Sequence, residues 1–235
     1  MTFLEYFQRS ISQNCPVTKN ILQYFNKNAS SFNGNNTLHH GATKKCVDIL
    51  KISLEHDINI EEKNMDGNTP IHLAATAEYI EPMIYLIEKG SNIEEKNLEG
   101  NTSLHIAVEA EYIEPMNYLI ENGSNIEEKN LEGNTPLHIA VATQNEKLIK
   151  FLIENGSNIE EKNLVGNTPL HIAAASDNDK IVKYLIQNGA SSTQFTKNNA
   201  GQIPYEVAKH NDYIFRTLFI DFLDYALKSS KFSSN

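Results

Sequence analysis

The sequence predicts an all-α repeat solenoid, a stack of short helical units that follow one another along the chain. The first observation is a Gly-Asn-Thr block that recurs every 33 residues, at Gly67, Gly100, Gly133 and Gly166. The second is a Leu-Ile pair that follows each block at a constant distance, beginning with Leu86-Ile87. A fixed period of this length indicates supersecondary units that bury their apolar faces against their neighbours. Such a stack offers an extended binding surface and no ready-made catalytic pocket.

Each unit is predicted to contain two helices, because helix start and stop signals recur with the same period. Threonine is a favourable N-cap and proline suits the first helical position, and the two follow each other at Thr69, Thr135 and Thr168. Ser103 replaces the proline in the second full unit, and a first turn tolerates serine. Gly90 follows the Leu-Ile pair and supplies the left-handed residue that ends a second helix.

These residues resemble the ankyrin repeat, whose signature is Thr-Pro-Leu-His with an alanine two residues after the histidine. The resemblance covers about residues 31–220, in about six units. It implies two antiparallel helices in each repeat, followed by a β-hairpin finger that projects sideways. It also implies a protein-binding role in which fingertips often contact the partner.

The domain organisation follows from the repeats. The array is predicted to span residues 31–228, with units near 34–66, 67–99, 100–132, 133–165, 166–200 and 201–228. Residues 1–30 carry apolar groups at helical spacing and are predicted to form an N-terminal helical cap, and residues 229–235 a disordered tail. The aromatic segment 213–225 has two interpretations: a helix that covers the end of the array, or a surface for docking or self-association.

Composition limits the partners. The formal net charge of −10 argues against nucleic acids and anionic membrane surfaces, which bind clustered Lys and Arg. No apolar run is long enough to span a bilayer. Two cysteines, Cys15 and Cys46, are too few for a disulfide scaffold and indicate a reducing compartment. We therefore expect a cytoplasmic monomer, and secretion as an effector that acts inside a host cell stays open.

The motif histidines are the first candidates for chemistry, and the sequence favours a structural role for them. They are His39, His72, His105, His138 and His171. Equivalent residues on stacked helices lie roughly 8–10 Å apart, whereas zinc needs each donor nitrogen about 2.1 Å from one ion. We expect each ring to bond loop backbone between repeats. No phosphate-binding loop or nucleophile signature is present either, so the sequence predicts no metal, no cofactor and no catalysis.

An Asn-Ile-Glu-Glu-Lys-Asn segment recurs between the helical units and predicts an acidic comb. Its charged residues are Glu61, Glu62, Lys63, Glu94, Glu95, Lys96, Glu127, Glu128, Lys129, Glu160, Glu161 and Lys162. Exposed Glu–Lys neighbours contribute only about 0–1 kcal/mol, so one interpretation is that the pattern serves solubility alone. Alternatively, carboxylates such as Glu95, Glu128 and Glu161 steer a basic segment of a partner towards the concave face.

The predicted fingertips carry a column of apolar residues two positions before each motif glycine. The column contains Phe32, Met65, Leu98, Leu131 and Leu164, with Asn199 in the last unit; Asp66, Glu99 and Glu132 flank it. Exposed apolar patches usually mark interaction sites. Repeat duplication is the competing explanation, because residues 67–99 and 100–132 differ at few positions.

Matching to the family places further candidates on the concave face, among them Thr76, Glu109, Thr143 and Ser176. The sequence therefore predicts a non-enzymatic scaffold that binds another protein through its fingertips and concave surface. The alternative is an inhibitor that sequesters a basic segment of a signalling or transcription protein.

Overall fold

The computed structural model describes most of the repeat array. The described residues are 33–44, 47–176, 178–190, 192–208 and 218. The predicted N-terminal cap, the aromatic segment 213–225 apart from Leu218, the predicted tail, Phe32 and both cysteines lie outside them. The chain divides into two compact units, Met1–Asn125 and Ile126–Asn235, and each is described by itself.

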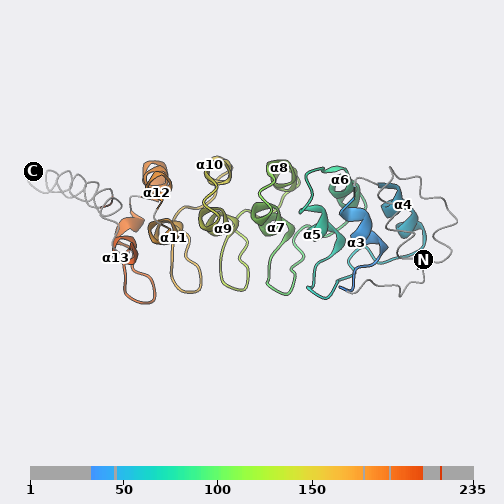
Figure 1. Cartoon of the computed structure of the whole chain (residues 1–235), viewed down its shortest axis with the longest axis horizontal. Helices are drawn as coiled ribbons and strands as arrows, with labels where there is room; N and C mark the ends of the chain where they lie inside the picture. The colour runs from blue at the N-terminus through green and yellow to red at the C-terminus, as the bar shows by residue number, and fades with distance from the viewer. Residues whose placement is uncertain (1–32, 45–46, 177, 191, 209–217, 219–235) are drawn as a thin grey trace, which may run out of the picture. The chain divides into compact units, whose positions relative to one another are not determined.

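The first unit contains three pairs of helices. They are α3 (Thr37–Ala42) with α4 (Val47–Glu55), α5 (Pro70–Ala74) with α6 (Glu81–Glu88), and α7 (Ser103–Glu109) with α8 (Ile113–Glu121). α5 packs between α3 and α7 in an inner row, and α4 packs against α6 in an outer row. In Figure 1 the loops between the pairs project from the inner row, on the side away from α6 and α8.

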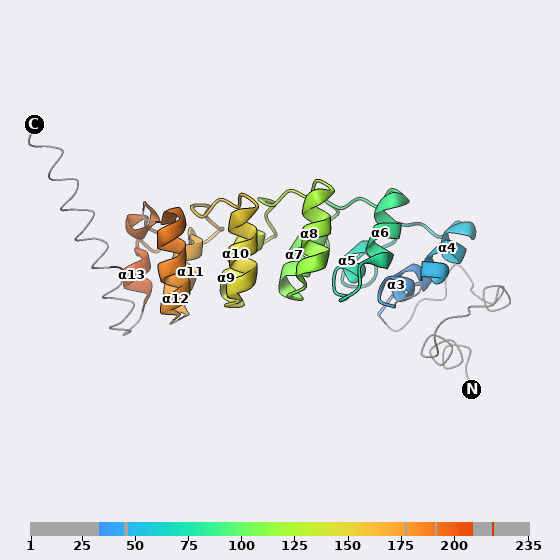
Figure 2. The same ribbon diagram turned by 90° about the horizontal axis from the view of Figure 1, so that it is seen from above.

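The second unit repeats this arrangement. Its pairs are α9 (Pro136–Ala142) with α10 (Glu146–Glu154), and α11 (Pro169–Ala175) with α12 (Asp179–Leu185), followed by two short turns, Ile186–Ala190 and Thr193–Phe195, and by α13 (Pro204–Val207). α11 packs against α9 and α13. Figure 2 shows α10 and α12 side by side over α9 and α11. Each unit is thus a stack of helix pairs, which confirms the predicted all-α repeat fold.

The core of each unit lies between the two rows of helices. Alanines on the inner helices, such as Ala74 and Ala107, are fully buried and let the neighbouring helix approach. The outer helices fill the space with larger side chains, such as Leu86 and Leu119, that are also fully buried. Burial of one leucine contributes roughly 1.5–3 kcal/mol. The helical spacing of apolar residues therefore accounts for the layering.

The fingers differ from the predicted β-hairpins, because no segment within the described ranges is a β-strand. In the finger before α5, the Asn64 N–H donates to the Asn68 carbonyl oxygen at 2.9 Å. The Asn64 side-chain oxygen also accepts the N–H groups of Asp66 (3.0 Å) and Asn68 (2.9 Å). The asparagine side chain thereby closes a tight turn and takes N–H groups that a strand ladder would use.

Candidate functional site

The motif histidines join the start of each inner helix to the next finger. The Nδ1 atom of His72 accepts the backbone N–H of Thr69 (3.1 Å) and lies 2.8 Å from the Thr69 hydroxyl. Its Nε2 atom lies 3.0 Å from the Asn101 carbonyl oxygen. Because a carbonyl only accepts and an N–H only donates, the ring is the neutral tautomer with its proton on Nε2. The predicted bond to loop backbone is confirmed.

The same contacts recur in the second unit, at His138 and His171. Their Nε2 atoms lie 3.1 Å from the carbonyl oxygens of Asn167 and Gln202. Burial lowers the pKa of His138 from 6.5 to about 4, although its bond to the Asn167 carbonyl opposes the shift. No three His, Cys, Asp or Glu side chains come together as a metal-ion site in the described part of the chain.

The charged finger segment of the first unit bonds one finger to the next. The Glu61 carboxylate accepts the Asn92 N–H at 2.8 Å. Lys63 lies 2.6 Å from the Glu95 carboxylate and donates to the Lys96 carbonyl oxygen at 2.9 Å. The Lys63 ammonium lowers the pKa of Glu95, so this carboxylate stays ionised. Glu61 and Glu95 of the comb are therefore already engaged by the next finger and by Lys63.

Fingers of the second unit form the same bonds. The Glu127 carboxylate accepts the Asn158 N–H at 2.8 Å. Lys129 lies 2.6 Å from the Glu161 carboxylate and donates to the Lys162 carbonyl oxygen at 2.8 Å. The recurring hexapeptide thus has a structural explanation, since its charges link consecutive repeats.

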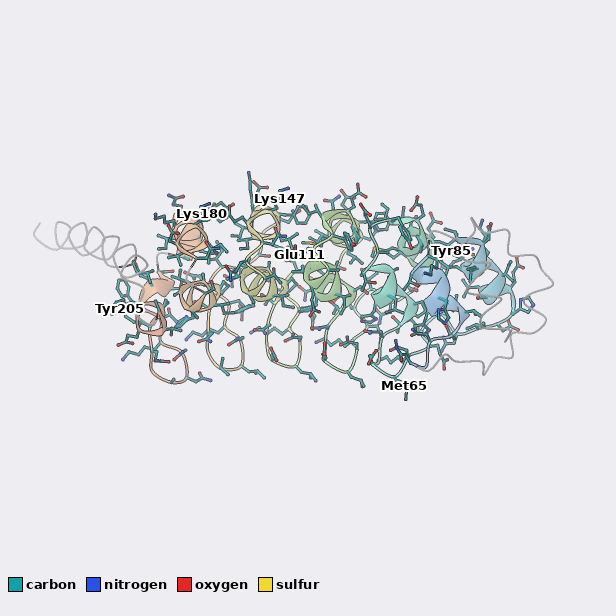
Figure 3. All side chains as sticks on the ribbon, in the orientation of Figure 1. Met65, Tyr85, Glu111, Lys147, Lys180 and Tyr205 are labelled. Atoms are coloured by element: carbon teal, nitrogen blue, oxygen red, sulfur yellow. The ribbon has the colours of Figure 1, made fainter. Side chains whose placement is uncertain are left out.

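The apolar fingertips face solvent in both units. Met65 and Leu98 of the first unit are 69% and 67% exposed, and Leu131 and Leu164 of the second are both 68% exposed. In Figure 3, Met65 lies at the end of a finger, far from the helices. The predicted exposure of this column is confirmed for each of these four residues.

Backbone contacts within each unit hold the fingertips at Leu98 and Leu164 in place. The Leu98 N–H donates to the Asp66 carbonyl oxygen at 3.1 Å, and the Leu164 N–H to the Glu132 carbonyl oxygen at 3.0 Å. Gly133 leaves the space that the Leu164 backbone occupies, because a β-carbon there would lie 2.6 Å from the Leu164 nitrogen. The motif glycine is therefore required by the next finger as well as by its own turn.

A family model described as ankyrin repeats matches three times, over residues 8–97, 38–130 and 104–196. The chain belongs to the ankyrin-repeat family. No curated protein matches it. Ankyrin repeats are generally protein–protein interaction modules, and proteins built from them are typically non-enzymatic scaffolds.

Other properties of this ankyrin-repeat chain stay predictions, among them the number of six repeats, the cytoplasmic location and the monomeric state. Across the helices that the structure describes, none has the length and apolar character needed to cross a membrane.

The predicted concave residues of these ankyrin repeats have local structural roles. The hydroxyl groups of Thr76, Thr143 and Ser176 donate to the carbonyl oxygens three residues earlier, at 2.7, 3.0 and 2.9 Å. Thr76 and Glu109 are exposed, whereas Thr143 and Ser176 are half-buried; Glu128 of the acidic comb is half-buried as well. The threonine and serine hydroxyls therefore donate to carbonyl oxygens at the ends of the inner helices. Each hydroxyl oxygen can still accept a hydrogen bond from a partner.

The acidic fingertip residues next to the apolar column are exposed. Glu99 and Glu132 each accept a side-chain N–H from the asparagine two residues later, Asn101 at 3.0 Å and Asn134 at 2.8 Å. Asp66, in the first unit, occupies the equivalent position.

Sequence reasoning missed one fingertip residue of this ankyrin-repeat chain. Val165 follows Leu164 and is 58% exposed. The signal was present, because Val165 stands where the other fingers carry Asp66, Glu99 and Glu132. This finger therefore presents two adjacent apolar side chains.

Proposed function

We propose that this chain is a non-enzymatic interaction module that binds another protein through its fingertips, with the concave residues beside them. The observation that carries this proposal is the exposure of the fingertip side chains. Met65, Leu98, Leu131 and Leu164 are at least 67% exposed, whereas Ile113, Phe195 and Tyr205 are at most 39% exposed. Large apolar side chains that remain in water favour an interface.

The rigidity of the fingers supports the same proposal. The fingertips at Leu98 and Leu164 are tied by backbone hydrogen bonds to the preceding finger of their own unit. A preorganised surface loses less conformational freedom when a partner binds, so more of the contact energy appears as affinity. The fingertips thus present fixed apolar contacts within each unit.

Sequestration of a basic segment, the alternative hypothesis, has less support. Glu61 and Glu127 accept backbone N–H groups of the next finger, and Glu95 and Glu161 pair with lysines. These carboxylates would have to exchange existing bonds for new ones. Binding that weakens strongly with added salt would favour sequestration, whereas weak salt dependence would favour the apolar fingertips.

The chain itself supplies the substitution that tests the fingertips. Asn199 occupies the equivalent position in the last finger and keeps the backbone bond, because its N–H donates to the Val165 carbonyl oxygen at 3.0 Å. A triple variant, Leu98→Asn, Leu131→Asn and Leu164→Asn, should therefore fold and lose only the apolar contacts. Ile113→Asn, on an outer helix, is the control.

Partners captured from lysate by the wild-type chain would be identified by mass spectrometry, purified and titrated by calorimetry. We expect the triple variant to lose affinity and the control to retain it. Equal affinity of a folded triple variant would refute the fingertip site and make the column a result of repeat duplication.

A further inference from the structure

A basic groove lies between two outer helices of the second unit. It has a volume of about 470 Å³ and runs between α10 and α12. Its lining includes four lysines, Lys147, Lys150, Lys180 and Lys183, and one carboxylate, that of Glu146. Figure 1 places α10 and α12 on the side of this unit opposite its fingers. The groove is therefore separate from the proposed fingertip site.

Two of the four lysines have no ion pair within the part of the chain that the structure describes. Lys147 and Lys180 both project from the outer helices (Figure 3). Lys150 lies 3.7 Å from Glu154 and Lys183 lies 3.1 Å from Asp179, in pairs one helical turn apart. Exposed pairs of this kind are weak and screened by solvent. The groove thus keeps a positive charge in a chain whose net charge is −10.

Lys147 and Lys180 are specific to these two helices, because α4 carries Asp48 at the equivalent position, whereas α4 does carry a lysine, Lys51, at the position equivalent to Lys150 and Lys183. At the positions equivalent to Lys147 and Lys180, α6 and α8 carry Glu81 and Glu114. At those equivalent to Lys150 and Lys183 they carry Ile84 and Asn117. Repetition of a common unit does not explain a change of charge sign at the same position. The second unit therefore differs from the first on its outer face.

The floor of the groove is apolar. Ile149 and Ile181 line it and are each 1% exposed, and the half-buried ring of Tyr184 lies beside them. A floor of this kind accepts an aliphatic or aromatic side chain, while the lysines around it attract carboxylates. Nucleic acid fits less well, because its phosphates gain nothing from an apolar floor and the net negative charge of the chain repels a long polyanion.

We propose that the groove between α10 and α12 binds an acidic segment of a partner protein, with one apolar side chain of that segment seated between the lysines. The segment binds by charge complementarity around an apolar anchor. This second surface lets the chain hold one protein at its fingertips and another at its outer helices.

Selection from a random peptide library, displayed on phage, tests the chemistry of the groove without a known partner. The full chain is the target, and selected peptides are synthesised with a fluorescent label and titrated by anisotropy. We expect the selected set to include peptides with several Asp or Glu residues around one aliphatic or aromatic residue. Their affinity should fall as salt is added.

A charge-matched pair of variants locates the binding. Lys147→Glu with Lys180→Glu should weaken these acidic peptides by at least about tenfold. Lys51→Glu with Lys89→Glu, in the first unit, changes the net charge equally and should leave the affinity unchanged. The fingertip triple variant should also bind the peptides normally, so the groove is tested independently of the proposed function. Circular dichroism verifies that every variant is folded.

Several outcomes would overturn the proposal. One is a selection that yields no acidic peptides, and another is equal weakening by both double variants, which would indicate a nonspecific charge effect. A labelled oligonucleotide that displaces the peptides and itself depends on Lys147 and Lys180 would assign the groove to nucleic acid. Self-association in sedimentation that only Lys147→Glu with Lys180→Glu abolishes would assign it to a second copy of the chain.

Discussion

The Nε2–H group of His138 donates to the carbonyl oxygen of Asn167 at 3.1 Å. On its other edge the ring accepts the backbone N–H of Thr135 at 3.2 Å. One imidazole thus links the first turn of α9 to the finger that precedes α11. The Nδ1 contact requires a neutral ring, because a proton on Nδ1 would face the Thr135 N–H.

Acid should therefore destabilise the fold through His138. The folded pKa of about 4 lies below the unfolded value of 6.5, so the unfolded chain binds more protons between these values. The contribution to stability is complete above pH 6.5 and is lost as the pH falls towards 4. We expect a loss of about 2 kcal/mol between pH 7 and pH 5 from this residue, measured by urea unfolding at each pH.

The variant His138→Gln separates the contribution of His138 to the pH dependence of stability from that of the other titrating groups. It should be less stable at pH 7 and should show a smaller loss between pH 7 and pH 5 than the wild-type chain. His56→Gln is the control, since His56 is an exposed residue just after α4 whose Nδ1 bonds the Ile52 carbonyl of that helix. An unchanged pH dependence in His138→Gln would contradict the assignment.

The hydroxyl of Thr135 should stabilise the array through the histidine ring. It lies 2.8 Å from His138 Nδ1, and Thr135 is fully buried. Thr135→Val keeps the shape and removes the hydroxyl, so we expect a loss of about 1 kcal/mol in the free energy of unfolding. Thr135→Ser keeps the hydroxyl and should lose less. Equal denaturation midpoints for the Val variant and the wild type would show that the hydroxyl contributes nothing.

Much of the fold followed from local signals, because each repeat carries its own start, stop and burial pattern. Thr135 and Pro136 start α9 as expected, and the ring of His138 bonds loop backbone as expected. The hydroxyl contact between Thr135 and this ring was not expected. A threonine N-cap normally bonds backbone N–H groups, and the sequence does not show that a ring nitrogen lies within reach.

Contacts between repeats were harder to predict than the helices. Lys63 and Glu95 meet only because consecutive fingers stack in register. The sequence alone therefore did not show that this carboxylate of the acidic comb is already paired. The basic groove was missed for a similar reason. Lys147 and Lys180 each resemble ordinary helix-surface residues, and they form one surface only when α10 and α12 lie side by side.

Gly133 should tolerate alanine much less well than Gly156. Both have a positive φ, +74° and +93°, which costs alanine about 1 kcal/mol at either position. A β-carbon on Gly133 would also lie 2.6 Å from the Leu164 backbone nitrogen, whereas one on Gly156 meets no atom within 4 Å. We expect Gly133→Ala to cost about 3 kcal/mol and Gly156→Ala about 1 kcal/mol. Thermal unfolding would measure the stability of both variants. Equal losses of stability would mean that the finger carrying Leu164 moves aside without cost.

Asp57 offers the opposite experiment, a substitution that should stabilise the chain. It follows α4 at the position equivalent to Gly90, and its φ is +56°, where a residue with a β-carbon is strained. Its carboxylate also lies near the negative end of the helix dipole. Asp57→Gly relieves both effects, although glycine gains freedom in the unfolded chain, so we expect a net gain of about 0.5 kcal/mol. Asp57→Asn, which removes only the charge, is the matched control. Urea unfolding should rank the glycine variant above the asparagine variant and both above wild type, and a glycine variant less stable than wild type would contradict the strain at this position.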